Sequence, residues 1–174
     1  GLDPARLNEA KRKHGSVCAY ADDKHPEVRL LSNDEMFGLE CDLLVPAAME
    51  DQIDSSNANL IKAPVILELA NGPVTAEADE VLEKKGIVVL PDILANAGGV
   101  TVSYYEWVQN RQGLYWTAEE VQARLKPLME RESMAVWRVA QSKNVSMRTA
   151  AYVHALERLS DAIKAHGTQA YFCA

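Results

Sequence analysis

The sequence predicts an α/β fold, in which a mostly parallel sheet carries helices on both faces and is followed by long C-terminal helices. Three apolar runs, at residues 41–46, 63–69 and 86–91, are continuous rather than alternating, which is typical of strands covered on both faces. Helical segments of roughly ten residues alternate with these runs, and this alternation indicates a parallel sheet. The pattern then changes to two long helical segments. We therefore expect a sheet-containing domain at residues 1–116 and C-terminal helices at residues 117–174 that pack on or beside it.

The composition is that of a soluble globular protein with one ordinary domain. The 174 residues are 48% hydrophobic and 25% charged, and the formal net charge is −7. Because a nucleic-acid surface needs clustered Lys and Arg, this charge argues against nucleic acid as a partner. The basic run at residues 11–14 is short, and we interpret it as a solvated helix face.

The three cysteines, Cys18, Cys41 and Cys173, have no metal-ligand spacing and cannot all pair with one another. A reduced, cytoplasmic location is the simplest interpretation. The longest apolar runs are far too short to span a membrane, and the sequence shows no signal-type amino terminus. We therefore expect neither a membrane nor a metal partner.

The first helix has signals at both ends. Asp3 followed by Pro4 is a helix start, and Gly15 offers a stop after about His14. The sequence opens directly in this helix, and it contains neither a G-x-G-x-x-G turn nor a P-loop. The opening strand and turn of the expected α/β domain are therefore missing from these residues.

Short elements are expected next. Residues 16–21 and 27–31 are strand candidates. The sequence Ser-Asn-Asp-Glu at residues 32–35 is a capping-box pattern that predicts a short helix ending near Gly38.

Each of the three apolar runs is followed by a predicted helix. The first of these helices is expected near residues 56–62, the second at residues 75–85, and the third after the glycine pair Gly98–Gly99. The glycine pair itself is expected in the connection between strand and helix.

Two long helices complete the chain. Residues 117–120 form a capping box, Ser146 is expected to cap the last helix, and Gly167 is expected to close it. For Trp137 and His154, which lie in these helices, packing is a better interpretation than catalysis.

Small residues and amides follow all three predicted strands. Ligands of open parallel sheets bind beyond the carboxyl ends of the strands. An Asn side chain there both donates and accepts hydrogen bonds, and glycine lacks the Cβ that would block a flat ring. The residues concerned are Ala47, Ala48, Asn71, Gly72, Asn96, Ala97, Gly98 and Gly99. Simple tight turns explain either glycine-containing segment alone, and two of them at successive strand ends favour a ligand site.

Candidates for acid–base or nucleophilic chemistry are few. Ser103 has no His or Lys near it in sequence, and Glu68 and Asp92 have no obvious partner. A hydrolase is therefore disfavoured. A cofactor that supplies the chemistry, with a protein that binds and orients it, fits these residues better.

Four segments carry a resemblance to a known family. These are PAAMEDQI, ELANGPVTAEAD, GIVVLPDILANAGGVTVSYYEWVQN and MRTAAYVHALERL. Together they closely resemble the glutamate/leucine/phenylalanine/valine dehydrogenase family, and within it the carboxyl-terminal half of the glutamate dehydrogenases. The resemblance covers essentially the whole chain, and its motifs are long and in the same order.

The resemblance implies an incomplete Rossmann-like domain that binds NAD or NADP. Asn71 is then expected at the nicotinamide ribose and Asn96 near the nicotinamide carboxamide. Gly98 and Gly99 are expected beneath the ring and the substrate. Ala47 and Ala48 match a loop that passes close to the dinucleotide. The family's Gly-rich turn, and the acidic residue that helps to choose between NAD and NADP, would lie before Gly1.

The resemblance also implies a substrate. Val100 and Ser103 match residues that line the substrate side-chain pocket of glutamate enzymes, where the serine hydroxyl contacts the γ-carboxylate. Since a carboxylate needs a donor, Ser103 favours glutamate over branched-chain or aromatic amino acids. Leu69 departs from the family pattern, because many relatives carry glycine there, and the approach of the backbone at this point is less certain as a result.

The implied reaction is the oxidative deamination of L-glutamate to 2-oxoglutarate and ammonia. The residues here would supply positioning, and none of them is assigned a catalytic role. This chain alone is therefore expected to be inactive, since the family's catalytic lysine and aspartate belong to a separate substrate domain. The intact enzyme is expected to be a homo-oligomer, since the family's enzymes are commonly hexamers. The alternatives are a branched-chain or aromatic amino-acid dehydrogenase fragment, and a non-catalytic remnant that binds a nucleotide or a partner.

Overall fold

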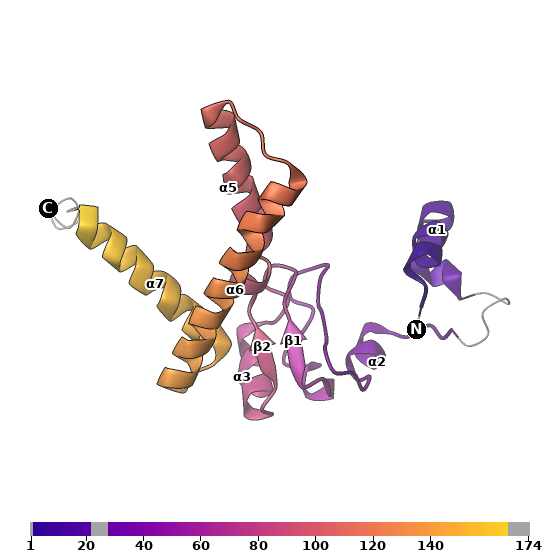
Figure 1. The fold of residues 1–174 in the computed structure, drawn as a ribbon. Helices are drawn as coiled ribbons and strands as arrows, with labels where there is room; N and C mark the ends of the chain where they lie inside the picture. The colour runs from indigo at the N-terminus through magenta and orange to yellow at the C-terminus, as the bar shows by residue number, and fades with distance from the viewer. Residues whose placement is uncertain (1, 22–27, 167–174) are drawn as a thin grey trace, which may run out of the picture. The chain divides into compact units, whose positions relative to one another are not determined.

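The computed structural model of the protein describes residues 2–21 and 28–166 (Figure 1). The chain divides into two compact units, residues 1–39 and residues 40–174. The expected positions of Gly167 and Cys173, and the first residue of the predicted strand at 27–31, lie outside the described residues. Within the described parts of the chain, no helix is both long and apolar enough to cross a membrane.

The first unit contains the predicted first helix. Helix α1 spans Pro4–His14, and the Asp3 carboxylate accepts a hydrogen bond from the Ala5 N–H at 2.9 Å. Gly15 ends the helix, and its N–H donates to the Lys11 carbonyl. Residues 11–14 are exposed, in agreement with a solvated basic face.

The two strand predictions in this unit are wrong for the described residues. Val17–Tyr20 forms the 3-10 helix η1, because the Ser16 hydroxyl accepts a hydrogen bond from the Cys18 N–H and closes a local turn. Residues 28–31 have no regular structure. A strand needs a partner strand, and none is present among the described residues of this unit.

The predicted short helix is confirmed. Helix α2 spans Asn33–Phe37, and Ser32 and Glu35 form the expected reciprocal capping box.

The second unit contains a small parallel sheet. Strand β1 spans Val65–Leu67 and strand β2 spans Val88–Leu90, in parallel register with Ile66 opposite Val89. Leu44 extends the sheet on the other side of β1, because its N–H donates to the Val65 carbonyl and its carbonyl accepts from the Leu67 N–H. The α/β class is confirmed.

The strand predicted at residues 41–46 is reduced to this one bridge at Leu44. The neighbouring side chains of Leu43 and Val45 are exposed, so the segment is not covered on both faces as its apolar run suggested. An apolar run that is left uncovered gains little from pairing as a strand.

The helices after the first two strands differ in how well they were predicted. Helix α3 spans Ala76–Lys84 with Thr75 as its N-cap, as expected. Residues 56–62 contain only the 3-10 helix η2, Ala58–Leu60. A turn competes with the helix there, since the Asp54 carboxylate accepts from the Ser56 N–H and the Asn57 amide oxygen accepts from the Asp54 N–H.

The glycine pair lies inside a helix rather than in the connection before it. Helix α4 spans Asp92–Ala95, and helix α5 begins at once and spans Ala97–Gln112. Gly98 and Gly99 therefore occupy the first turn of α5.

The last two helices are long, as predicted. Helix α6 spans Ala118–Lys143 with the Thr117–Glu120 capping box, and helix α7 spans Met147–His166 with the Ser146 hydroxyl accepting from the Thr149 N–H. They form a helical hairpin beside β2 (Figure 1). The core of this hairpin consists of Val136, Ala140, Met147, Ala150 and Ala151, with Leu90 and Leu94 packed against it. The hairpin therefore fixes where the start of α7 meets the sheet.

Candidate functional site

Three chain segments end at the carboxyl edge of the sheet. The Pro46 carbonyl accepts hydrogen bonds from the N–H groups of Leu69 and Ala70, both at 3.0 Å. The segment after Leu44 therefore lies against the segment after β1, and Ala47 and Ala48 follow directly, both exposed.

The two asparagines predicted at this edge are in direct contact. The Asn96 Nδ2 donates to the Asn71 Oδ1 at 2.7 Å, although the residues are 25 positions apart in the chain. The same nitrogen lies 3.4 Å from the carbonyl oxygens of Leu69 and Ala70. Within the described residues this contact uses one acceptor and one donor of the pair, so the Asn71 Nδ2 and the Asn96 Oδ1 remain to bind a polar ligand.

The turn that carries Asn71 is held by the end of the next strand. Gly72 follows Asn71 with a φ of +54°, a conformation that favours glycine. Its N–H donates to the Asp92 carboxylate at 2.8 Å. The Asp92 N–H in turn donates to the Glu68 carboxylate at 2.8 Å. The ends of β1 and β2 are therefore joined through backbone amides and carboxylates.

One arginine binds the carboxylates of this edge. The Arg148 guanidinium donates to both oxygens of Glu68, at 2.7 and 3.0 Å, and its Nε donates to Asp79 at 2.8 Å. Its Nη1 lies 3.6 Å from the Asp92 carboxylate. Glu68 is fully buried, whereas the side chains of Arg148, Asp79 and Asp92 are about one-quarter exposed. We refer to these four residues as the Arg148 cluster.

The charge of Arg148 is secured by its partners. Burial alone lowers its pKa, but the hydrogen bonds to Glu68 and Asp79 outweigh burial and raise the pKa above its ordinary value. The guanidinium is thus a permanent cation among three carboxylates. Within the described residues, no group of three or more His, Cys, Asp or Glu side chains is placed to hold a metal ion.

The glycine pair faces little of the protein. A Cβ added to Gly99 would have no atom within 4 Å, and one added to Gly98 would only touch the Leu125 side chain at 3.9 Å, in both cases among the described residues. Packing therefore does not require glycine at either position.

The predicted substrate residues lie on the exposed face of α5. Val100 is 69% exposed, and Ser103 is also exposed. The Ser103 hydroxyl donates to the Gly99 carbonyl at 3.2 Å, so its proton is engaged within the helix. One helix thus carries the glycines and both predicted substrate contacts, and the Asn71–Asn96 pair adjoins its first turn.

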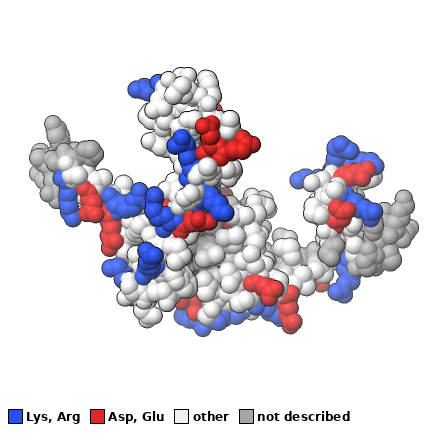
Figure 2. Space-filling view, viewed as in Figure 1, with Lys and Arg blue, Asp and Glu red and all other residues white. Residues whose placement is uncertain are grey.

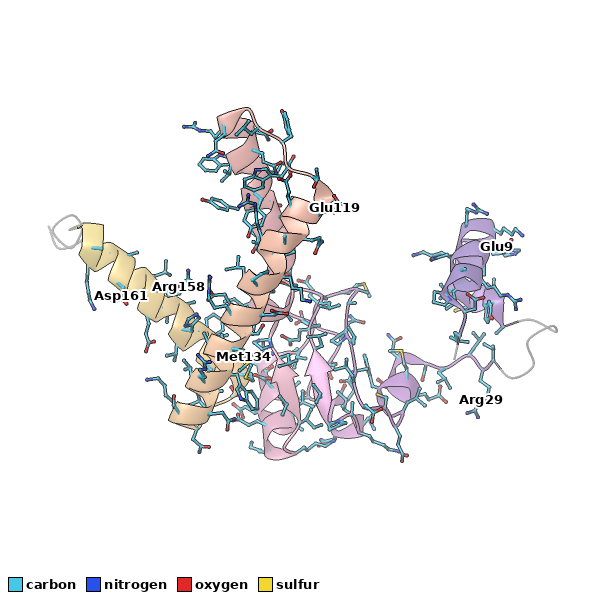
Figure 3. The ribbon with its side chains drawn as sticks, in the orientation of Figure 1. Glu9, Arg29, Glu119, Met134, Arg158 and Asp161 are labelled. Carbon is cyan, nitrogen blue, oxygen red and sulfur yellow. The ribbon has the colours of Figure 1, made fainter. Side chains whose placement is uncertain are left out.

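A second polar cluster lies between α6 and α7. The Glu132 carboxylate contacts the His154 Nε2 at 2.8 Å and accepts from Arg158 at 2.9 Å, and Figure 3 shows Arg158 on α7. The hydrogen bond with His154 is the main reason why the pKa of Glu132 lies below its ordinary value, with smaller contributions from Arg131 and Arg158. This pairing agrees with a packing role for His154.

Sequence reasoning missed Arg148 and Asp79. It noted Glu68 and Asp92 but found no partner for them, and the partner lies 80 residues after Glu68. A signal was present: Arg148 lies in the first turn of a helix, where the helix dipole disfavours a cation unless carboxylates are near.

Positive and negative side chains are interspersed on the face shown in Figure 2. No large area of one sign is seen in this view.

Comparison with known proteins gives consistent matches. Residues 1–167 match the family described as Glutamate/Leucine/Phenylalanine/Valine dehydrogenase. The chain is 50% identical to an NADP-specific glutamate dehydrogenase of Synechocystis sp. over 99% of its length, and 41% identical to an NAD-specific glutamate dehydrogenase of Clostridioides difficile over 96%. These alignments cover 41% and 38% of the two relatives, so the chain spans about two-fifths of their length.

A solved structure matches as well. The hetero-hexameric glutamate dehydrogenase of Thermus thermophilus, in a form with Leu bound, superimposes with a TM-score of 0.83 at 36% identity. The match covers 95% of this chain and 38% of that one.

Proposed function

Because this chain belongs to the Glutamate/Leucine/Phenylalanine/Valine dehydrogenase family, we propose that its residues form the cofactor-binding part of an NAD(P)-dependent glutamate dehydrogenase. The observation that carries the proposal is the Asn71–Asn96 contact at the carboxyl ends of the strands. In open parallel sheets this edge is where dinucleotides bind.

The residues fit a nicotinamide group. The free donor and acceptor of the asparagine pair match the hydroxyls of a ribose and the two polar atoms of a carboxamide. Gly99 leaves open the space that a Cβ would occupy, and a flat ring needs such space. Asn71, Asn96, Gly98 and Gly99 would hold the nicotinamide end, with Ala47 and Ala48 beside the dinucleotide.

The chemistry is shared between the cofactor and the protein. A bound nicotinamide would supply an acceptor for the hydride from the α-carbon of the amino acid. This chain binds and orients the reactants, and it places small residues where the two must approach each other. The proton transfers fall to residues outside this chain, and we expect no turnover from these 174 residues alone.

L-glutamate is the proposed substrate. Val100 and Ser103 lie on the exposed face of α5. Ser103 would exchange its bond to the Gly99 carbonyl for a stronger, charge-assisted bond to the γ-carboxylate. The two curated relatives described above are both named glutamate dehydrogenases, which supports glutamate over branched-chain or aromatic amino acids. One is NADP-specific and the other NAD-specific, so both cofactors belong in the assay.

The test is Ser103→Ala in the protein as its source makes it. Loss of one hydrogen bond to a charged group costs about 1.5–3 kcal/mol, so we expect kcat/KM for L-glutamate to fall about 10- to 100-fold. Oxidation is followed by the absorbance of NADH and of NADPH.

Thr101→Val is the matched control. The Thr101 hydroxyl donates to the carbonyl four residues earlier, at 2.8 Å, as the Ser103 hydroxyl does, but Thr101 is not assigned to the substrate. Its kcat/KM should stay within about twofold of the parent. An unchanged kcat/KM in Ser103→Ala would remove the role assigned to Ser103. Absence of NAD- or NADP-dependent glutamate oxidation in the parent would overturn the proposed function.

The assembled enzyme is proposed to be a homo-oligomer. The hetero-hexameric assembly named for the Thermus thermophilus relative supports an oligomer, and the identity of the subunits is part of the proposal. Light scattering coupled to size-exclusion chromatography measures the oligomeric state directly.

A further inference from the structure

Arg148 has an unusual place for a cation. It is the second residue of α7, and the amino terminus of a helix carries a partial positive charge that disfavours a neighbouring cation. The three carboxylates of the Arg148 cluster offset this cost. Each of them comes from an element at or near the sheet: Glu68 follows β1, Asp79 lies in α3, and Asp92 begins α4.

A chain of hydrogen bonds leads from Arg148 to Gly72, the residue that follows Asn71. One Glu68 oxygen accepts both from the Arg148 Nη1 and from the Asp92 N–H. The Asp92 carboxylate accepts from the Gly72 N–H, next to Asn71. Asp92 also opens α4, whose C-terminal neighbour is Asn96. Both asparagines are thus attached to groups that Arg148 holds.

We propose that Arg148 is a positioning residue for the nicotinamide end of the dinucleotide, acting through Glu68 and Asp92 on Asn71 and Asn96. This inference rests on the proposed function, because it takes the asparagine pair as the nicotinamide contact. Among the described residues, Arg148 makes no hydrogen bond with either asparagine, so the proposed role is an indirect one.

Removal of the guanidinium is expected to change the spacing between Glu68 and Asp92. Glu68 and Asp92 are left facing each other without a cation, and like charges at short range repel. Their separation sets the distance between the Asn71 turn and the start of α4. A shift of an ångström in this spacing is enough to break the 2.7 Å contact between the asparagines.

The effect should be confined to one end of the dinucleotide. The Arg148 cluster is joined to Asn71 and Asn96, which bind the nicotinamide and its ribose in the proposed function. ADP lacks both of these groups. A positioning role therefore weakens binding of NADH or NADPH and spares ADP, whereas a general loss of structure weakens all three.

The experiment compares these probes in the protein as its source makes it. Arg148→Lys keeps the charge but cannot donate to Glu68 and Asp79 together in the planar geometry of a guanidinium. Asp92→Ala removes the acceptor for the Gly72 N–H and leaves the Arg148 contacts with Glu68 and Asp79 in place. NADH and NADPH are titrated by their fluorescence, and ADP is measured by competition with them.

Lys85→Met is the matched control. Lys85 is also a cation that holds chain segments at an end of the sheet, but it binds the carbonyls of Ala58, Asn59 and Ile61 at the opposite end. Circular dichroism of every variant establishes that it is folded.

The expected result is a loss of about tenfold or more in affinity for the preferred dinucleotide in Arg148→Lys and Asp92→Ala, with ADP affinity within about twofold. Lys85→Met should change neither. Two results would overturn the inference in a parent that binds the dinucleotide more tightly than ADP. One is an equal loss of affinity for ADP and for the dinucleotide, and the other is no loss of dinucleotide affinity in either variant. A parent that binds NADH and NADPH no more tightly than ADP would overturn the proposed function as well. If Arg148→Lys does not fold, Asp92→Ala decides alone.

Discussion

The two ends of the parallel sheet are each held by one cation, but the two cations bind different partners. At the amino end, the Lys85 ammonium donates to three backbone carbonyls, at 2.7, 2.8 and 3.4 Å. At the carboxyl end, the Arg148 guanidinium binds three carboxylates, one of them fully buried. The cation at the amino end thus binds neutral carbonyl groups, whereas the cation at the carboxyl end binds charged carboxylates.

This difference agrees with the proposal that the carboxyl end carries function. Backbone carbonyls are present in any loop, and one exposed lysine satisfies them at little cost. A buried carboxylate is expensive unless it is paired, so the carboxyl end depends on Arg148 in a way that the amino end does not depend on Lys85. The carboxyl end, where an unpaired buried charge would be costly, is also the end where the asparagines and glycines lie, and such costs are common at functional sites.

The largest expected effect is that of Arg148→Met on stability. Removing one partner of a buried ion pair costs about 3–5 kcal/mol, because the fully buried Glu68 carboxylate would lose its cationic partner. Lys85→Met should cost less, about 1–2 kcal/mol, because it leaves neutral carbonyls rather than a buried charge without a partner. Urea unfolding of both variants measures the two values. Equal losses would show that the two ends do not differ in the way described.

Two glycines, one at each end of the sheet, test the comparison, and replacing them is expected to have an effect of intermediate size. Gly72 at the carboxyl end and Gly86 at the amino end have φ of +54° and +74°, and neither would bring a Cβ within 4 Å of another described atom. Replacement by Ala should therefore cost about 1–2 kcal/mol of backbone strain at each position. The two variants should be equally destabilised in thermal unfolding, whereas only Gly72→Ala should weaken NADH or NADPH binding. A binding defect in Gly86→Ala would contradict the assignment of function to one end.

The smallest expected effect lies outside both ends, at Glu132. Its pKa is lowered in the folded state, chiefly by His154 and then by Arg131 and Arg158. A lowered carboxyl pKa stabilises the fold above the ordinary pKa, and this contribution is lost as the pH falls through the folded-state pKa. Glu132→Gln should thus lose up to about 1 kcal/mol at neutral pH and match the parent at a pH below the lowered folded-state pKa. Unfolding free energies of both proteins, measured from neutral to acidic pH, test this prediction. A difference between the two proteins that does not change with pH would exclude the mechanism.

Local signals in the sequence predicted part of the fold well. Capping boxes at Ser32 and Thr117 and the cap at Thr75 begin helices where expected, because the side chain and the backbone that it binds are only a few residues apart. Strands were predicted less well. Residues 16–21 and 41–46 have suitable composition, but a strand is decided by its partners and by what covers it, and a single sequence does not show these.

The candidate site shows the same limit. The sequence indicated Asn71, Asn96 and the glycine pair, since all follow strand ends. Their direct contact confirms that Asn71 and Asn96 meet, while their roles in binding stay predictions. The role of Arg148 was not predicted, because its partners lie 56 to 80 positions earlier, a separation that no local pattern spans.

The sequence separation between each cation and its partners also affects the order in which the two ends of the sheet form during synthesis. During synthesis, the Lys85 contacts at the amino end can form once residue 85 has emerged, because Lys85 binds carbonyls only 24 to 27 positions earlier. The carboxyl end has to wait for residue 148, and until then Glu68 and Asp92 lack their cation. The carboxyl end of the sheet therefore obtains its full set of contacts only when α7 docks, later than the amino end.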